Sequence, residues 1–179
     1  MKYAMAAAYG AIFVITAGFN ATASASTDEE AFSAPWGSNS KPGVEPVTDE
    51  SYRQECGSCH MAYPPGLLPA HSWERLMTTL DDHFGKNVEI PKKHWKTIIN
   101  YLLNSAAGRV DYQVSNQMIR NIKGIPVRIS ELPYFRHRHQ DIPEHLVSGN
   151  PEVRSFSNCS ACHAQAEQGL FDEGRKSGD

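Results

Sequence analysis

The sequence has no excess of positive charge and no long hydrophobic run. It contains 17 Lys and Arg residues against 20 Asp and Glu residues, so binding to the phosphate backbone of nucleic acid is a poor hypothesis. A mean hydropathy of −0.47 excludes a polytopic membrane protein. The 7 Phe, 7 Tyr and 3 Trp among 179 residues argue against a disordered chain. These properties indicate a soluble globular protein of one compact unit or two small halves.

The first 25 residues have the pattern of a secretory signal peptide. A single charge, Lys2, precedes an apolar run from Ala4 to Phe19, and small residues follow this run up to Ala25. A membrane anchor is the alternative, but polar and glycine residues interrupt the run, and a spanning helix needs about 20 apolar residues. We therefore expect cleavage near Ala25 and export of the remaining chain. Loss of Lys2 makes its net charge one unit more negative than the −3 of the full sequence.

All four cysteines lie in two copies of the motif C-x-x-C-H, and none is left over. The motif residues are Cys56, Cys59 and His60 in the first copy and Cys159, Cys162 and His163 in the second. This motif is typical of covalent haem c attachment. Cysteines three positions apart lie on one side of a helical turn, where their sulfurs can form thioethers with the two vinyl groups, and the next residue can bind the iron. The sequence therefore predicts two covalently bound haem c groups, with His60 and His163 as proximal iron ligands.

Three other chemistries could use the same cysteines. A thioredoxin-like C-x-x-C motif requires a βαβ context, and no apolar strand precedes Cys56. A four-cysteine zinc site gives no reason for a histidine directly after each second cysteine. A disulfide within each motif would close a very small loop and remove little chain entropy. Exported thiols are expected to be paired or bound to a cofactor, and two haem groups meet this expectation best.

Hydrophobic periodicity predicts a mostly α-helical fold with little or no sheet. Apolar residues at helical spacing predict helices from Ser72 to Phe84, from Pro91 to about Ala107 and from Ser130 to about His139. A further helix is expected to begin at Asn150-Pro151 and to carry the second motif toward Gly169. The predicted organisation is two small haem-wrapping modules of different design, with these parts: signal peptide 1–25, loose lead-in 26–50, first haem c module 51–108, linker 109–128 and second haem c module 129–179.

The sixth ligand of each iron decides between an electron carrier and a catalyst. The candidates outside the motifs are Met61, Met77, Met118, His71, His83, His94, His137, His139 and His145. Met77 lies in an apolar stripe, where a methionine usually packs in the core. His83 and His139 each end an apolar helical face, where an unpaired imidazole is costly. Either could be a satisfied core histidine, but these two are the best candidates for distal ligands, with His71 and His94 in reserve.

The order of the histidines also carries information. His83 follows the first motif histidine by 23 residues, whereas His139 precedes the second one by 24. If each half is self-contained, the two modules are therefore not a simple tandem repeat. The sequence leaves open which of the two haem groups His83 serves.

Several motifs beyond the cysteines are typical of one family. They are Cys-Gly-Ser-Cys-His-Met-Ala-Tyr-Pro-Pro-Gly-Leu-Leu-Pro at 56–69, Ser72-Trp73, Leu76-Met77, His83-Phe84-Gly85, Leu132-Pro133-Tyr134-Phe135 leading to His139, and Ser157-Asn158-Cys159-Ser160-Ala161-Cys162-His163. From about residue 52 to 171 the chain resembles the small periplasmic dihaem cytochromes c found with the oxygen-binding cytochrome called sphaeroides haem protein. The resemblance implies two bis-histidine haems, with His60 and His163 as proximal ligands and His83 and His139 at the distal positions.

The expected function is electron transfer in the periplasm through two low-potential bis-histidine haems, since the thioether ligand that raises the potential is absent. The resemblance implies an oxygen-binding monohaem cytochrome c as acceptor and a membrane cytochrome b or quinol-linked protein as donor. The protein would be a monomer that forms transient complexes, and its acidic surface would meet a basic partner.

An enzyme is the alternative to an electron carrier. One haem could lack its sixth ligand and bind peroxide or nitrite, as in a peroxidase or reductase, with spare histidines acting as general acids or bases. The chain has little length left for a substrate pocket after it has wrapped two haems. We therefore expect an electron-transfer protein rather than an enzyme.

Overall fold

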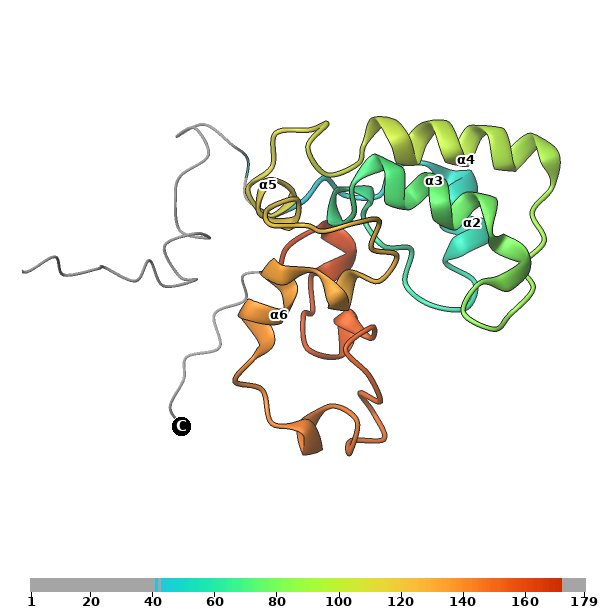
Figure 1. The fold of residues 1–179 in the computed structure, drawn as a ribbon. Helices are drawn as coiled ribbons and strands as arrows, with labels where there is room; N and C mark the ends of the chain where they lie inside the picture. Colours follow the sequence, from blue (N-terminus) through green and yellow to red (C-terminus); the bar gives the residue numbers. More distant parts are fainter. Residues whose placement is uncertain (1–40, 42, 172–179) are drawn as a thin grey trace, which may run out of the picture.

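The computed structural model describes residue 41 and residues 43–171, and the regular structure of these residues is helical (Figure 1). They form five α-helices and six short 3-10 helices, and their β pairings are three isolated bridges. The predicted mostly α-helical fold with little or no sheet is confirmed. The predicted signal peptide and most of the predicted lead-in lie outside the described residues.

Three α-helices form the part of the molecule that carries the first motif. Helix α2 (Glu50–Cys56) begins after Asp49, whose side chain accepts a hydrogen bond of 2.7 Å from the backbone N–H of Tyr52. Helices α3 (Ala70–Thr78) and α4 (Lys92–Asn104) lie side by side, and α2 packs against α4 (Figure 1). The first motif therefore starts at the C-terminal end of a helix that the rest of the module supports.

Helix α3 is shorter than the predicted helix over 72–84. It begins two residues earlier and ends at Thr78, and a 3-10 turn, η2 (Leu80–Asp82), follows it. The hydroxyls of Thr78 and Thr79 donate hydrogen bonds to carbonyls of the preceding turn, which competes with continuation of the helix. His83 therefore lies beyond the helix, in a turn closed by its own N–H, which donates a hydrogen bond of 2.8 Å to the carbonyl three residues later.

The other two predicted helices of the middle region are present. The helix predicted from Pro91 is α4, and Pro91 itself precedes its first turn. The helix predicted over 130–139 is present as a 3-10 turn, η3 (Ile129–Glu131), followed by α6 (Pro133–His139). The predicted linker contains a short helix, α5 (Gln113–Met118), which packs against α6.

The prediction of a helix from Asn150 onward is wrong, because the described chain between α6 and residue 171 contains no α-helix. It contains three 3-10 turns, η4 (Glu144–Leu146), η5 (Cys159–Ala161) and η6 (Ala166–Gln168). The side chain of Asn150 does accept a hydrogen bond of 3.0 Å from the N–H of Glu152, as a helix cap would. Arg154 then adopts a left-handed backbone with a φ of 67°, which ends the turn before a helix can form.

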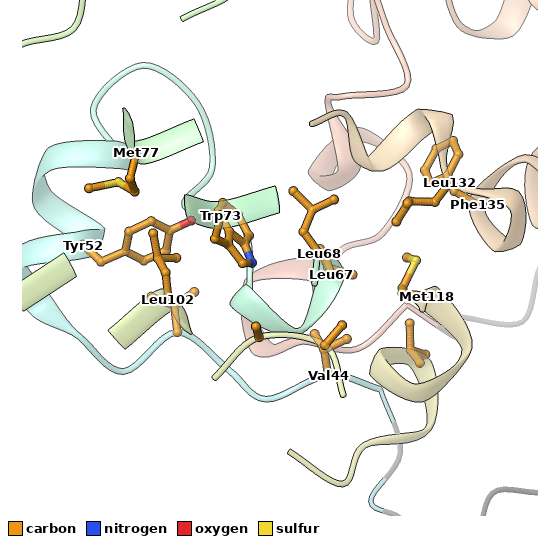
Figure 2. Close-up of a cluster of buried hydrophobic side chains, with 14 of the residues drawn as sticks. Val44, Tyr52, Leu67, Leu68, Trp73, Met77, Leu102, Met118, Leu132 and Phe135 are labelled. Atoms are coloured by element: carbon orange, nitrogen blue, oxygen red, sulfur yellow. The ribbon is translucent and has the colours of Figure 1, made fainter. Parts of the chain in front are cut away.

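One continuous hydrophobic core extends through both predicted modules. Figure 2 shows its buried side chains, which run from one end of the core to the other as Met77, Tyr52, Leu102, Trp73, Leu68, Leu67, Val44, Met118, Leu132 and Phe135. The first four come from α2, α3 and α4, and the last three come from α5, α6 and the residue before α6. The indole N–H of Trp73 donates a hydrogen bond of 2.7 Å to the carbonyl of Pro65, which satisfies this polar group inside the core. Shared burial of apolar surface therefore holds the two modules together.

Two glycines join the ends of the described chain. Gly43 and Gly169 both have left-handed backbones, with φ values of 70° and 77°. The N–H of Val44 donates a hydrogen bond of 2.9 Å to the carbonyl of Gly169, and a Cβ atom on Gly43 would overlap this carbonyl. Glycine meets both the backbone conformation and the close approach. The contact holds the last turn of the described chain against the end of the lead-in.

Replacing Leu132 with Ala should lower the free energy of unfolding by about 2–5 kcal/mol, because the side chain is fully buried (0 % exposed) where the modules meet. Leu146 is 43 % exposed and provides the matched control, for which the same substitution should change stability by less than about 0.5 kcal/mol. Chemical denaturation of the haem-loaded protein, followed by far-UV circular dichroism, measures both values. Equal losses in the two variants would show that the shared core does not carry the stability.

Candidate functional site

The first C-x-x-C-H motif begins at the end of α2. Cys56 is the last helical residue, and Gly57 ends the helix with a hydrogen bond of 3.0 Å from its N–H to the carbonyl of Arg53. The turn that follows leaves Cys59 and His60 on the surface. Both cysteines and the histidine are thus presented within one turn of the helix end.

His83 faces His60 across a gap suited to one metal ion. The centroids of the two imidazole rings lie 6.3 Å apart, and the ring planes differ by 24°. Two imidazoles that bind one metal from opposite sides, through bonds of about 2 Å, place their centroids roughly 6 Å apart. The structure therefore brings together the motif histidine and one of the two histidines singled out in the sequence.

The second motif has the same kind of partner. His163 follows the 3-10 turn η5, and His139 is the last residue of α6. Their ring centroids lie 6.1 Å apart, and the ring planes differ by 77°. The ring of His139 is also stacked on Phe135, with centroids 3.9 Å apart and an interplanar angle of 8°. The two histidine pairs therefore share a spacing but differ in ring orientation.

Backbone carbonyls determine which nitrogen of two of these rings carries the proton. Nδ1 of His60 lies 2.7 Å from the carbonyl oxygen of Met61, and Nδ1 of His139 lies 2.8 Å from that of Phe135. A carbonyl oxygen can only accept a hydrogen bond, so the proton must be on Nδ1 in both rings. The neutral imidazole then has its lone pair on Nε2, the tautomer that a metal-binding histidine requires.

His83 is favoured in its neutral form by its surroundings. Its Nδ1 atom is buried and has no hydrogen-bond partner among the described residues. Burial, and to a smaller extent the nearby His60, lowers the pKa of His83 below its usual value. A metal binds the neutral imidazole, so this environment is compatible with a ligand role.

A cavity of about 750 Å³ lies beside the second histidine pair. Cys159, Cys162, His139 and His163 all line it, so the attachment groups and both histidines meet in one space. The remaining walls are mainly aliphatic and aromatic, and they include Leu67, Val114, Met118, Ile142, Val147 and Phe156. Cofactor sites typically have a volume of about 300–1,000 Å³ and apolar walls with a few polar groups. These residues therefore fit a covalently attached haem.

The segments that carry the two motifs touch each other. The hydroxyl of Tyr63 donates a hydrogen bond of 2.7 Å to the carbonyl of Ser157, and the hydroxyl of Ser160 donates one of 3.3 Å to the sulfur of Met61. The ring of Tyr63 also stacks on His60, with centroids 4.9 Å apart. A second cavity of about 760 Å³ lies between the two segments. Tyr63 thus contacts the first motif and the chain that leads into the second.

The cysteines are not arranged as zinc ligands. All four thiols are free of disulfides, and no group of three or more His, Cys, Asp or Glu side chains within the described residues could hold a metal ion. Burial raises the pKa of Cys56 to about 11, with a further contribution from Glu55. Burial also raises the pKa of Cys159 to about 11. Both thiols are therefore protonated at neutral pH when no cofactor is attached.

The other candidate ligands lie elsewhere. Nδ1 of His94 is 2.6 Å from a carboxylate oxygen of Glu55, so this histidine is hydrogen-bonded to a carboxylate. Met77 is 5 % exposed and belongs to the hydrophobic core. His71 and His145 are exposed on the surface. The structure thus brings only His83 and His139, of the six additional histidines, into ring contact with a motif histidine among the described residues.

The model of one protein family, dihaem cytochrome c, matches residues 52–171 of the chain. The chain belongs to the dihaem cytochrome c family. This dihaem cytochrome c therefore carries two haem c groups, for which its four motif cysteines are present. No functionally curated protein matches it. Within the described residues, no helix has the length and apolar character needed to span a membrane.

Two solved structures are similar to this dihaem cytochrome c over most of their own length. The diheme cytochrome c from Rhodobacter sphaeroides is 41 % identical, covers 72 % of this chain and 99 % of its own, and has a TM-score of 0.63. The diheme cytochrome type c from Shewanella baltica OS155 is 40 % identical, covers 69 % of this chain and 86 % of its own, and has a TM-score of 0.57. The family resemblance inferred from the sequence motifs is confirmed.

Replacing Cys159 and Cys162 together with Ala should leave a protein with one covalent haem instead of two, because these are the attachment residues of the second motif. The reciprocal replacement of Cys56 and Cys59 is the matched control and should remove the other haem. Intact-protein mass spectrometry and the haem content per chain measure both outcomes. The assignment of the cysteines is wrong if either double variant still carries two covalent haems.

Proposed function

We propose that this protein is an electron carrier in which His60 and His83 bind one haem iron and His139 and His163 bind the other. The ring separations of 6.3 Å and 6.1 Å support this assignment most directly, because both match two imidazoles on one metal. Each haem c supplies a reversible one-electron couple at its iron. His83 and His139 fill the positions at which oxygen or peroxide would otherwise bind, so the protein exchanges electrons without activating a substrate.

The side chains around the two sites favour low reduction potentials. A thioether ligand raises the potential of a haem, and an imidazole in its place does not. Met77 is held in the core, and the sulfur of Met61 accepts a hydrogen bond from Ser160. Neither sulfur replaces a histidine in the two ring pairs, so in the proposed ligation each iron has two imidazole ligands and no thioether ligand.

Contact between the two motif segments supports electron exchange between the sites. The rate of electron transfer falls steeply with the distance between donor and acceptor, so a short packed connection favours it. Tyr63 stacks on His60 and donates a hydrogen bond to Ser157, which lies two residues before Cys159. This tyrosine gives a continuous path from one histidine ligand to an attachment residue of the other site.

The proposed compartment is the periplasm, since residues 1–25 have the pattern of a signal peptide. The proposed acceptor is an oxygen-binding monohaem cytochrome c of the sphaeroides haem protein type, and the proposed donor is a membrane cytochrome b or quinol-linked protein. Resemblance to the dihaem cytochromes c that occur with that acceptor supports these partners. Complexes between redox proteins are typically small and short-lived, which suits a monomeric carrier.

The two ring pairs should give two different low-spin electron paramagnetic resonance signals. Nearly parallel rings (24°) separate the energies of the iron orbitals with which they overlap, whereas nearly perpendicular rings (77°) leave these orbitals close in energy. We therefore expect one rhombic and one highly anisotropic signal from the oxidised protein. The absorbance spectrum of the reduced protein should not change with carbon monoxide, because both iron positions are filled.

Substitution of each distal histidine provides the control for these signals. The variant His139→Met should lose only the anisotropic signal and gain a higher potential at one haem, with both haems still attached. The variant His83→Met should lose only the rhombic signal. A high-spin signal or carbon monoxide binding in the unaltered protein would contradict bis-histidine ligation and would favour an enzyme with an open iron.

Replacing Tyr63 with Phe should slow electron exchange between the two haems. The ring remains, but its hydrogen bond to Ser157 is lost, at a cost in stability of roughly 1 kcal/mol. Replacing Tyr101 with Phe is the matched control, because it also removes one hydrogen bond, from the N–H of Thr48, but this bond joins the lead-in to α4 and does not connect the two motif segments. Exchange is measured by nuclear magnetic resonance in partly reduced samples. Equal exchange rates in the two variants would contradict a role of Tyr63 in coupling the sites.

A further inference from the structure

The linker after α5 and helix α6 concentrate positive charge in a chain that is acidic overall. Residues 120–138 contain five of the 17 Lys and Arg residues but only one of the 20 Asp and Glu residues, Glu131. The five basic residues are Arg120, Lys123, Arg128, Arg136 and Arg138. An uneven charge distribution of this kind creates a local field that can attract an acidic molecule.

A cleft of about 620 Å³ lies within this basic segment. Lys123, Arg136 and His137 line its walls, and neither Lys123 nor Arg136 forms an ion pair with another described residue. Glu131 is the one acidic residue among the described lining residues, and Arg128 pairs with it at 3.6 Å. The cleft therefore has two cationic side chains that form no ion pair among the described residues.

Helix α6 separates this cleft from the second haem site. Arg136 and His137 line the cleft, whereas Phe135 and His139 line the cavity that contains the second pair of motif cysteines. A helix with its side chains is about 10 Å in diameter. A molecule bound in the cleft would therefore lie within roughly one helix diameter of the second haem cavity.

Phe84 extends the same surface to the first haem site. Its ring is 45 % exposed, and its centroid lies 4.9 Å from that of the His83 ring. The guanidinium of Arg128 lies over the Phe84 ring, 4.1 Å from its centroid. Since Arg128 also pairs with Glu131 at the cleft, Phe84 and the cleft belong to one continuous surface.

The backbone of Phe84 is strained. Its φ of 53° is left-handed, a conformation that is rare and unfavourable for a bulky side chain. Strain of this kind occurs mainly at binding sites and active sites, where the rest of the fold maintains it. An exposed aromatic ring that is held in a strained turn beside a haem ligand is therefore a candidate contact residue.

We propose that Phe84, Lys123, Arg128 and Arg136, here called the α6 face, form the docking surface for an acidic redox protein. The proposal rests on the electron-carrier function proposed above and adds where the partner binds and what charge it presents. Carboxylates of the partner pair with Lys123 and Arg136, and an apolar group packs on Phe84. This arrangement places the partner beside His83 and within roughly one helix diameter of the second haem cavity. Electrostatic complementarity of this kind mainly accelerates association and weakens with added salt.

Charge reversal on the α6 face tests the proposal directly. The variant Lys123→Glu/Arg136→Glu is compared with Lys92→Glu/Lys96→Glu, which makes the same change in net charge at exposed positions of α4. The probe is a plant-type ferredoxin, an acidic redox protein of low potential, in its reduced form. Its rate of electron transfer to the oxidised haem-loaded protein is measured by stopped flow at low and moderate salt. We expect the α6-face variant to be slower by about tenfold or more, the α4 variant to stay within about twofold, and salt to slow the unaltered protein.

The ring of Phe84 is tested by Phe84→Asn, because asparagine accepts a left-handed backbone more readily than phenylalanine. This variant should keep the haem spectra and melting temperature of the unaltered protein, but its rate with ferredoxin should fall severalfold. Basic mitochondrial cytochrome c serves as the opposite probe, and its reaction should not be slowed by the charge reversals. Equal slowing by the two double variants, or no slowing by either, would overturn the proposed docking surface.

Calorimetric titration with oxidised ferredoxin separates this proposal from the electron-carrier function. Binding that is lost in the α6-face variant and retained in the α4 variant supports the docking surface, whether or not electrons are transferred. Electron transfer from ferredoxin that is equally fast in all variants, with unchanged binding, contradicts the docking surface and leaves the electron-carrier function standing. Binding at the α6 face without any reduction of the haems contradicts the electron-carrier function alone.

Discussion

Two imidazole rings can share one iron only if the segments that carry them are held at a fixed separation. In the first site His60 is positioned by the end of α2 and His83 by the turn after α3. In the second site His139 ends α6, and its ring lies against Phe135, which is itself part of the hydrophobic core. The core that joins α2 to α6 therefore does more than stabilise the fold. It sets the ring separations on which the proposed bis-histidine ligation depends.

The two modules reach this common geometry by different means. The first uses three packed α-helices, whereas the second has one helix, α6, and a chain of 3-10 turns in its described part. So few regular hydrogen bonds would leave the second module weak by itself, and the shared core and the contact of Gly43 with Gly169 compensate for this. The cavity of about 750 Å³ beside Cys159 has mainly apolar walls, which suit a covalently attached haem.

Basic residues are concentrated near α6, in a chain that is acidic overall. The negative net charge by itself predicts a basic partner. The charges are not evenly distributed, however, and the α6 face is basic. Association rates depend on the local field at the docking surface, which the net charge does not describe. The strained backbone of Phe84 fits the same interpretation, because a fold retains an unfavourable conformation where the side chain it presents is useful.

The amino-acid sequence by itself determined the covalent chemistry, because Cys56, Cys59 and His60 act within a single turn and their spacing encodes their geometry. It also indicated the mostly helical fold and singled out His83 and His139 as candidate ligands, since apolar periodicity is a local property. Only the tertiary structure decided which histidine faces which, that Tyr63 bridges the two motif segments, and that Phe84 and Arg128 meet across the surface. These contacts join residues that are 20 to almost 100 positions apart, and their distances depend on how the whole core packs. The helix predicted over 72–84 ended early at Thr78, where threonine hydroxyls bind carbonyls of the preceding turn. The helix predicted from Asn150 did not form, and Arg154 there has a left-handed backbone.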